Sequence, residues 1–450
     1  MQLLSEKQNF RDMSSDSTSP TPMLACTACG RQYPRDEIRY RCECSETLEV
    51  AYAADDAVRE GVTHATFDNR RAARRGIGAS GTWRFRELLP PFSDADIVSK
   101  LEGNTNLYPV GAAAGGGPGT IGRYAGLDTL FLKHEGENPT GSFKDRGMTV
   151  GVSQARRLGA HAVACASTGN TSAALAAYAA QAGIPCFVFI PAGAVARGKL
   201  AQTVGYGAIT VQIAGDFDDA MRLVQEVCAD LGIYLLNSIN PFRIEGQKTI
   251  GWELLQDLDW QPPDWIVLPA GNLGNTAALG KALAEAQHLG LIARLPRVAA
   301  IQARGAAPFF QSYQGGFAGP IALKAETVAT AIKIGSPVSY GRAVGVIRAT
   351  GGVVAAVEDA AILAAKRVID RAGIGCEPAS AATLAGIRQL VAAGVIARDA
   401  TVAGLLTGHL LKDADTTLAA AEAGRNLTAV PAERQAVARA LAPFLTRPAG

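Results

Sequence analysis

A lysine stands where a strand pattern gives way to a helix pattern. Lys144 follows a predicted strand over 129–134 and opens a predicted helix over 143–158. The positive end of a helix dipole lowers the pKa of an amine. Because imine formation with an aldehyde requires a neutral amine, Lys144 is a candidate covalent catalyst. An ordinary solvated lysine in a loop has the same local sequence, so the surrounding pattern must decide between the two.

Two other turns also join a predicted strand to a predicted helix. Ser167-Thr168-Gly169-Asn170-Thr171 follows the apolar run 162–166, and Gly271-Asn272-Leu273-Gly274-Asn275 follows a predicted strand over 265–268. Hydroxyls, glycines and the free N–H groups of a helix start form a cradle for an anion. Plain helix capping is the alternative for both turns, since Ser, Thr and Asn are favoured capping residues.

Four of the eight cysteines are clustered near the N-terminus. Cys26 and Cys29 are followed, after twelve residues, by Cys42 and Cys44. Four thiolates on two short turns can close tetrahedrally on Zn²⁺, and a Cys₄ set leaves no open position, so the metal would be structural. Zinc is favoured, but free thiols and a redox pair stay open as alternatives. The other four cysteines lie among apolar residues and are predicted to be core residues.

The segment 193–199 resembles the phosphate-binding loop of nucleoside triphosphatases. Leu200 stands where such a loop needs Ser or Thr to bind Mg²⁺, so that activity is excluded. Lys199 is kept as a candidate anion ligand.

Short apolar runs alternate with helix patterns from about residue 129 onward. Strands are predicted over 129–134, 162–166, 185–190, 209–213, 234–236, 265–268, 298–302 and 402–406, and helices over 143–158, 171–182, 199–204, 217–231, 244–258 and 276–288. This order predicts α/β structure, with parallel strands and helices on both faces of the sheet. Ligands of such sheets bind beyond the carboxyl ends of the strands, where the three turns lie.

Composition limits the class of protein. The 450 residues are 48% hydrophobic and 19% charged, with 43 Lys and Arg against 41 Asp and Glu. This excludes a wholly disordered chain, and a net charge of +2 gives no argument for nucleic acid as a partner. We also expect no membrane span, because no uninterrupted apolar stretch reaches about 18 residues. The N-terminus has no apolar secretory core, so we expect a cytoplasmic protein.

Several ordered motifs over residues 23–445 resemble one enzyme family, the threonine synthases. They are pyridoxal-phosphate enzymes of fold type II, the tryptophan-synthase-β-like fold. The motifs are Ser80-Gly81-Thr82-Trp83-Arg84-Phe85-Arg86, Gly103-Asn104-Thr105, Asn138 to Met148, Ser167 to Thr171, Asn237-Ser238, Glu245-Gly246-Gln247-Lys248-Thr249, Gly271 to Asn275, Glu377-Pro378-Ala379-Ser380 and Thr407-Gly408-His409.

The resemblance implies roles for individual residues. Lys144 would bind pyridoxal 5'-phosphate covalently and act as the catalyst, Asn170 would meet the ring hydroxyl and Thr407 the ring nitrogen. The cofactor phosphate would be wrapped by Gly271, Asn272, Leu273, Gly274 and Asn275. The substrate carboxylate would fall to Ser167, Thr168 and Thr171, and the substrate phosphate to Asn237, Ser238 and Arg243, with Lys199 a weaker addition.

The resemblance also implies a reaction. O-phospho-L-homoserine and water would give L-threonine and phosphate by γ-elimination followed by β-addition. A sister enzyme such as cysteate synthase, acting on O-phosphoserine and sulfite, is the nearest alternative. A threonine or serine dehydratase is less favoured because its substrate carries no phosphate. A non-catalytic binding protein is disfavoured by the presence of Lys144. By analogy with relatives we expect a homodimer.

The implied architecture is two doubly wound open sheets preceded by a small zinc-ribbon-like segment. The predicted divisions are a flexible tail over 1–22, the Cys₄ segment over 23–54, a helical extension over 55–102 and a catalytic core over 103–445. A smaller subdomain is expected at about 150–250 within that core. Asn106, Ser336 and Leu410 depart from the family pattern, and Leu410 is expected to add bulk near the pyridine side.

Overall fold

The computed structural model describes residues 22–53, 56, 59, 61–191, 197–214, 217–423 and 429–445, with the backbone alone at 191, 197–199, 217–222, 420–423 and 444. The predicted tail over 1–22 therefore lies outside the described residues, apart from residue 22. Within the described ranges the strands form three sheets. None of the helices in these ranges combines the length and the apolar character that crossing a bilayer requires.

The largest sheet has six strands in the order β12-β11-β10-β13-β5-β4. All neighbours are parallel except the edge strand β4, which runs antiparallel to β5. The strands are β4 (Leu107–Pro109), β5 (Thr129–His134), β10 (Trp265–Pro269), β11 (Arg297–Ala303), β12 (Val353–Val357) and β13 (Thr401–Leu406).

Alternate residues of this sheet face two separate cores, as a pleated strand requires. On β10, Ile266 and Leu268 lie in the core formed with α8 and α9, whereas Trp265 and Val267 lie in the core formed with α12 and α13. The helices are α3 (Gly116–Ala125), α8 (Pro241–Asp257), α9 (Gly274–His288), α10 (Pro308–Gln314), α11 (Tyr340–Ala349), α12 (Asp359–Arg371) and α13 (Pro378–Ala392).

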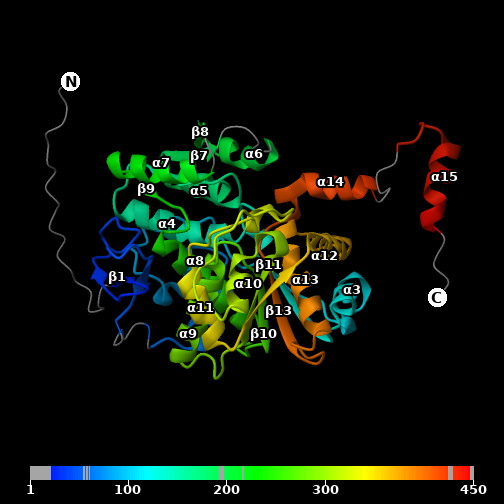
Figure 1. Ribbon diagram of the computed structural model, residues 1–450, viewed down its shortest axis with the longest axis horizontal. Coiled ribbons are helices and arrows are strands. Elements are labelled where there is room, and N and C mark those ends of the chain that lie inside the picture. Colours follow the sequence, from blue (N-terminus) through cyan, green and yellow to red (C-terminus); the bar gives the residue numbers. More distant parts are fainter. Residues whose placement is uncertain are drawn as a thin grey trace.

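A second, four-stranded parallel sheet has the order β8-β7-β6-β9 and lies above the first in Figure 1. Its strands are β6 (Val163–Ala166), β7 (Cys186–Pro191), β8 (Ile209–Ile213) and β9 (Tyr234–Leu235), and its helices are α4 (Lys144–Arg157), α5 (Asn170–Ala182), α6 (Arg197–Gly205) and α7 (Phe217–Asp230). Val163 and Cys165 pack toward α4 and α5, while Ala164 packs toward α7.

The Cys-bearing segment folds as a small antiparallel sheet in the order β2-β1-β3. It comprises β1 (Met23–Cys26), β2 (Gln32–Tyr33) and β3 (Leu48–Ala51), and lies at the opposite side of the body from α14 (Ala414–Ala423) and α15 (Arg434–Leu445) in Figure 1. The remaining elements are α2 (His64–Arg71) and the 3-10 turns η1 (Ile77–Ala79), η2 (Trp83–Leu88), η3 (Ala112–Ala114), η4 (Glu135–Glu137), η5 (Arg304–Ala306), η6 (Thr330–Ile332) and η7 (Leu410–Asp413).

The predicted fold class is confirmed. The strands predicted over 129–134 and 209–213 have those bounds, and the other predicted elements differ by a few residues at their ends. The two larger sheets contain two additional strands, β12 and the short antiparallel β4, whose Pro109 lacks the N–H that a central strand needs, and the Cys-bearing segment adds β1, β2 and β3. The division into four segments stays a prediction.

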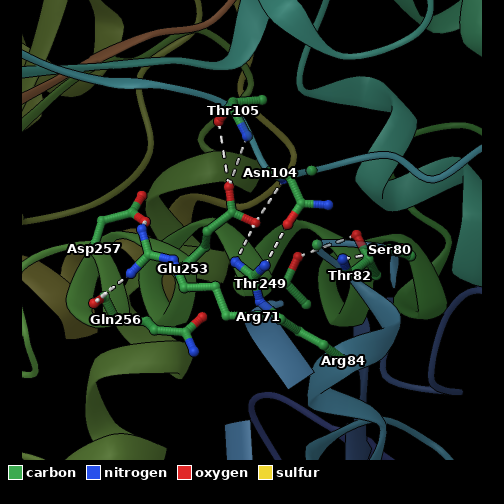
Figure 2. Close-up of polar contacts among 12 residues, drawn as sticks. Arg71, Ser80, Thr82, Arg84, Asn104, Thr105, Thr249, Glu253, Gln256 and Asp257 are labelled. Atoms are coloured by element: carbon green, nitrogen blue, oxygen red, sulfur yellow. Dashed lines mark hydrogen bonds and ion pairs between the residues drawn. The ribbon is translucent and has the colours of Figure 1, made fainter. Parts of the chain in front are cut away.

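Buried charges connect α4 to the larger body. Arg146 is fully buried and pairs with Glu135 (Nε to Oε2, 2.7 Å) and with Glu253 of α8 (Nη2 to Oε1, 2.8 Å). Lys133 lies 2.7 Å from the same Glu253 carboxylate. Burial alone would raise the pKa of Glu253, but these cations hold it well below its usual range. Figure 2 shows Glu253 also accepting the backbone N–H groups of Asn104 and Thr105, at 2.9 and 3.0 Å.

Helices α4 and α8 cross at a pair of glycines. A Cβ added to Gly246 would lie 1.7 Å from the carbonyl oxygen of Arg146, and one on Gly147 would lie 3.0 Å from the carbonyl oxygen of Arg243. Only residues without a side chain permit this approach. The crossing brings Lys144, at the start of α4, and Arg243, in the first turn of α8, to the same region.

Glu253→Ala should lower the free energy of unfolding by about 3–5 kcal/mol, because it leaves several buried cations without their partner. Urea unfolding followed by tryptophan fluorescence measures this, since Trp83, Trp252 and Trp260 lie in the adjoining core. Glu358→Ala is the matched control, because it breaks an exposed pair with Arg304 worth less than about 1 kcal/mol. Equal losses in the two variants would contradict the role given to Glu253.

Candidate active site

A cavity of about 1820 Å³ is lined from both large sheets. Strands β6, β10 and β13 direct their carboxyl ends toward it, as parallel sheets do at their ligand sites. The predicted residues that line it are Lys144, Ser167, Thr168, Asn170, Thr171, Asn237, Ser238, Arg243, Gly271, Asn272, Leu273, Gly274, Asn275 and Thr407. The side chain of Lys199, on α6, lies outside the described residues.

Lys144 is the first residue of α4, one residue after the predicted start of the helix. Its Nζ lies 3.9 Å from the centre of the Phe143 ring. Burial and, to a smaller extent, the cation of Arg243 together lower the pKa of Lys144 to about 7, against an opposing effect of Glu377. About half of the amine is therefore neutral near pH 7, which is the form that attacks a carbonyl.

The turn after β10 lines the cavity with residues Gly271 to Asn275. Leu273 has a left-handed backbone (φ 63°) and directly precedes α9. Such a conformation in a residue with a branched side chain is strained and is characteristic of functional turns. Asn272 fixes the turn, donating to Ser238 Oγ (2.7 Å) and accepting from the N–H of Val338 (2.7 Å).

Two buried polar atoms at the start of α9 have no partner among the described residues. They are Nδ2 of Asn275 and Oγ1 of Thr276. A buried donor without an acceptor costs about 1–3 kcal/mol, and an anion at this helix start would remove that cost. The turn therefore fits a phosphate group.

Thr407 follows β13 and lies beside the lysine turn. Its carbonyl accepts the N–H of Phe143 at 3.1 Å, and its hydroxyl lies 3.1 Å from Ser380 Oγ. Ser380 was part of a quoted motif but received no role from the sequence. The pair offers a neutral hydroxyl to the cavity instead of a carboxylate.

Glu377 is a cavity residue for which the sequence predicted no role. Both of its carboxylate oxygens accept from Asn170 Nδ2, at 3.2 and 3.1 Å. Burial raises the pKa of Glu377, while Asn170, Lys412 and Lys144 oppose that change. The sequence did contain one indication that Glu377 stands at a helix start. Pro378 follows it, and proline is common at the first position of a helix, as it is in α13.

Arg243 is a buried cation at the cavity wall. Its Nη1 donates to the carbonyl of Leu236 at 3.3 Å, and its Nε has no hydrogen-bond partner among the described residues. Burial lowers the pKa of Arg243 to about 10, and no described carboxylate counters that effect. An unpaired buried guanidinium is costly, so the site fits an anion that binds in its fork.

Asn237 and Ser238 lie between β9 and α8, and both were predicted to bind phosphate. They differ in how far hydrogen bonds within the protein already engage their side chains. The Asn237 amide is occupied, accepting from the N–H of Ala166 (2.9 Å) and donating to its carbonyl (3.0 Å). It thereby holds the end of β6 next to Ser167. Ser238 accepts from Asn272, so its own hydroxyl hydrogen is left to donate.

These groups together fit pyridoxal phosphate. The unpartnered amide of Asn275, which lines the cavity at the start of α9, suits its phosphate, the lowered pKa of Lys144 suits its aldehyde, and Thr407 suits a ring nitrogen. Asn170 lines the cavity and keeps its amide oxygen for the ring substituents.

The four clustered cysteines lie together, with their sulfurs within 4.8 Å of one another. Cys26 and Cys44 are 3.5 Å apart, and Cys29 and Cys42 are 3.6 Å apart. Sulfurs at about 2.3 Å from one tetrahedral Zn²⁺ lie about 3.8 Å from each other. The hydrogen bond from Tyr33 lowers the pKa of Cys42 to about 6. The geometry fits Zn²⁺.

Comparison with known proteins gives consistent matches. Residues 98–408 match the family model described as "Pyridoxal-phosphate dependent enzyme". The chain is 44% identical to "Threonine synthase" of Methanocaldococcus jannaschii over 88% of this chain and 94% of that protein. It is 47% identical to "Threonine synthase" of Methanosarcina acetivorans, over 88% and 93%. Among solved structures, the processed form of threonine deaminase isoform 2 from Solanum lycopersicum aligns with a TM-score of 0.59 at 20% identity, covering 72% of this chain and 89% of that one.

Substituting the two charged residues that act on the pKa of Lys144 should move that pKa in opposite directions. Arg243→Gln removes a like charge, so the pKa rises above about 7 and the amine becomes neutral at higher pH. Glu377→Gln removes an opposite charge, so the pKa falls. The pH dependence of the rate at which cofactor-free protein captures an aldehyde probe measures both. Glu358→Gln, at an exposed position, should leave the profile unchanged, and shifts of the same sign in the two test variants would contradict this account.

Proposed function

The chain belongs to the pyridoxal-phosphate-dependent enzymes, in the threonine synthase family, and from this premise we propose that its cavity converts O-phospho-L-homoserine and water to L-threonine and phosphate. The observation that carries the choice of substrate is Arg243, a buried guanidinium without a carboxylate partner among the described residues. A dianionic phosphate group on the substrate would provide the missing negative partner for this guanidinium. A dehydratase substrate such as threonine has no phosphate and would leave that charge buried and unpaired.

The substrate is held by its two anionic ends. Arg243 and Ser238 take the phosphate, with Asn237 positioning the Ser167 turn from behind. Ser167, Thr168 and Thr171 take the carboxylate at the N-terminus of α5, where hydroxyls and free N–H groups meet. This orientation places the carbons between those two groups near Lys144.

Pyridoxal phosphate, when bound to Lys144, supplies an electron sink for the charge left when the α-proton is removed. Lys144 Nζ, released once the substrate amine has taken its place, would be the base for that proton, since a pKa of about 7 lets the free amine accept and return protons near neutral pH. The same amine is in reach of the next carbon along the chain, so it also moves the β-proton. Asn170 and Thr407 hold the ring, and Glu377 orients Asn170 through two hydrogen bonds.

The Cys₄ segment is proposed to hold one structural Zn²⁺ through Cys26, Cys29, Cys42 and Cys44. A cytoplasmic location is proposed as well, because none of the eight cysteines, all of them among the described residues, forms a disulfide. The smaller domain is proposed to comprise the four-stranded sheet with its helices, close to the predicted 150–250. The homodimer stays a prediction from analogy.

Purified protein with pyridoxal phosphate should release phosphate and threonine in equal amounts from O-phospho-L-homoserine. Lys144→Ala should reduce this by at least about 10³-fold and abolish the visible absorbance of the covalently bound cofactor. Lys100→Ala, which removes a half-buried lysine that does not line the cavity, is the control. Phosphate without threonine would contradict the water-addition step. No phosphate from this substrate, with turnover of O-phosphoserine and sulfite, would favour the sister activity.

The purified protein should contain one zinc atom per chain, as measured by elemental analysis. Cys42→Ser should remove the metal and lower the thermal midpoint, because the metal replaces a large core in so small a sheet. Cys228→Ser is the control, since it changes a buried cysteine on α7 outside the cluster. Zinc-free protein with an unchanged midpoint would leave free thiols as the better interpretation.

A further inference from the structure

We propose that Arg41, in the Cys₄ segment, is a recognition residue for the substrate phosphate at the rim of the active-site cavity. This inference rests on the proposed function and adds a residue from outside the catalytic domain to the substrate site. Arg41 is exposed and lines the same cavity as Arg243 and Ser238, although some 200 residues separate them along the chain.

The position of Arg41 follows from its neighbour Tyr40. The hydroxyl of Tyr40 accepts the backbone N–H of Leu235 at 2.7 Å, and its ring lies 6.0 Å from that of Tyr234. These two residues form β9, the edge strand of the smaller sheet. Two residues after β9 the chain reaches Asn237 and then Ser238. The loop carrying Arg41 is therefore docked beside the proposed phosphate site.

Further contacts fix the same loop on α4. The side chain of Gln154 donates to the carbonyl of Arg35 at 3.3 Å, and Arg157 pairs with Asp36. The guanidinium of Arg35 lies 4.8 Å from the centre of the Phe92 ring and donates to the carbonyl of Pro91. The Cys₄ segment therefore packs on the domain proposed to hold the substrate, and the backbone of Arg41 has a fixed position relative to that domain.

The turn that carries Cys44 also holds Arg41 in place. Arg41 directly precedes Cys42, and its backbone bridges that of Thr47. Its Nη1 donates to the carbonyl of Ser45 at 2.7 Å, within the turn that carries Cys44. One of its five N–H donors is thus committed, and the others are directed at no described carboxylate. The remaining fork suits a phosphate oxygen pair.

Two arginines at different depths would act in sequence on one anion. Arg41 is exposed, so its charge acts on the approaching phosphate and is screened by salt. Arg243 is buried, so it binds the phosphate after water has been excluded. Loss of Arg41 should therefore weaken capture of the substrate while leaving the chemical step intact.

The test compares steady-state kinetics of Arg41→Ala and wild-type holoenzyme on O-phospho-L-homoserine at low and high salt. We expect KM to rise about three- to tenfold at low salt with kcat unchanged, and the salt dependence of kcat/KM to become weaker. Inhibition by inorganic phosphate should weaken by a similar factor, and Arg41→Lys should recover part of the loss.

Arg39→Ala is the matched control. Arg39 lies two residues away, with its guanidinium 4.3 Å from the Tyr33 ring centre and 2.6 Å from Glu37, and it does not line the cavity. Zinc content measured for every variant separates loss of the side chain from loss of the fold. Unchanged KM and unchanged phosphate inhibition in metal-loaded Arg41→Ala would overturn the role of Arg41. Absence of turnover in the wild type would instead contradict the proposed function.

Discussion

The paired charges around Arg146 fix the geometry on which the active site depends. Arg146 lies two residues after Lys144 and is completely enclosed, with Glu135 after β5 on one side and Glu253 of α8 on the other. Buried ions tolerate little displacement, because a lengthened pair leaves desolvated charge uncompensated. The first turn of α4 is therefore tied to the larger sheet, although the rest of that helix belongs to the smaller one. Lys144 is held at the boundary between the two.

The positive charges around Lys144 outweigh the negative charge. Arg243 and Lys144 repel each other, and Glu377 only partly offsets them. A bound phosphate beside Arg243 would screen its effect, so the pKa of Lys144 would rise when the substrate occupies the site. Departure of the phosphate would restore the lower pKa. The basicity of the amine is thus coupled to the presence of the group that leaves, through two side chains on crossing helices.

The sequence could indicate the cavity residues because each of the three turns lies where a strand pattern changes to a helix pattern. Lys144, the turn beginning at Ser167 and the turn beginning at Gly271 all lie at such changes, and all line one cavity. It did not assign Glu377 or Ser380, since their partners are more than a hundred residues away or in another element. Contacts of this kind are set by packing and not by local pattern. Likewise Leu410, expected near the pyridine side, packs against Gly375 and does not line the cavity.

The Cys₄ segment illustrates how a small module becomes part of an enzyme. Leu24 and Leu48 belong to the same core as Trp252 of α8, so the segment shares apolar packing with the larger body. Within the segment, Tyr52 donates to Glu245 at 2.5 Å, while Tyr40 accepts a hydrogen bond from the edge strand of the smaller sheet. The segment that carries the four clustered cysteines thus contacts both the larger body and the smaller sheet. The proposed Zn²⁺ would give this small sheet the rigid centre that its few apolar residues do not supply.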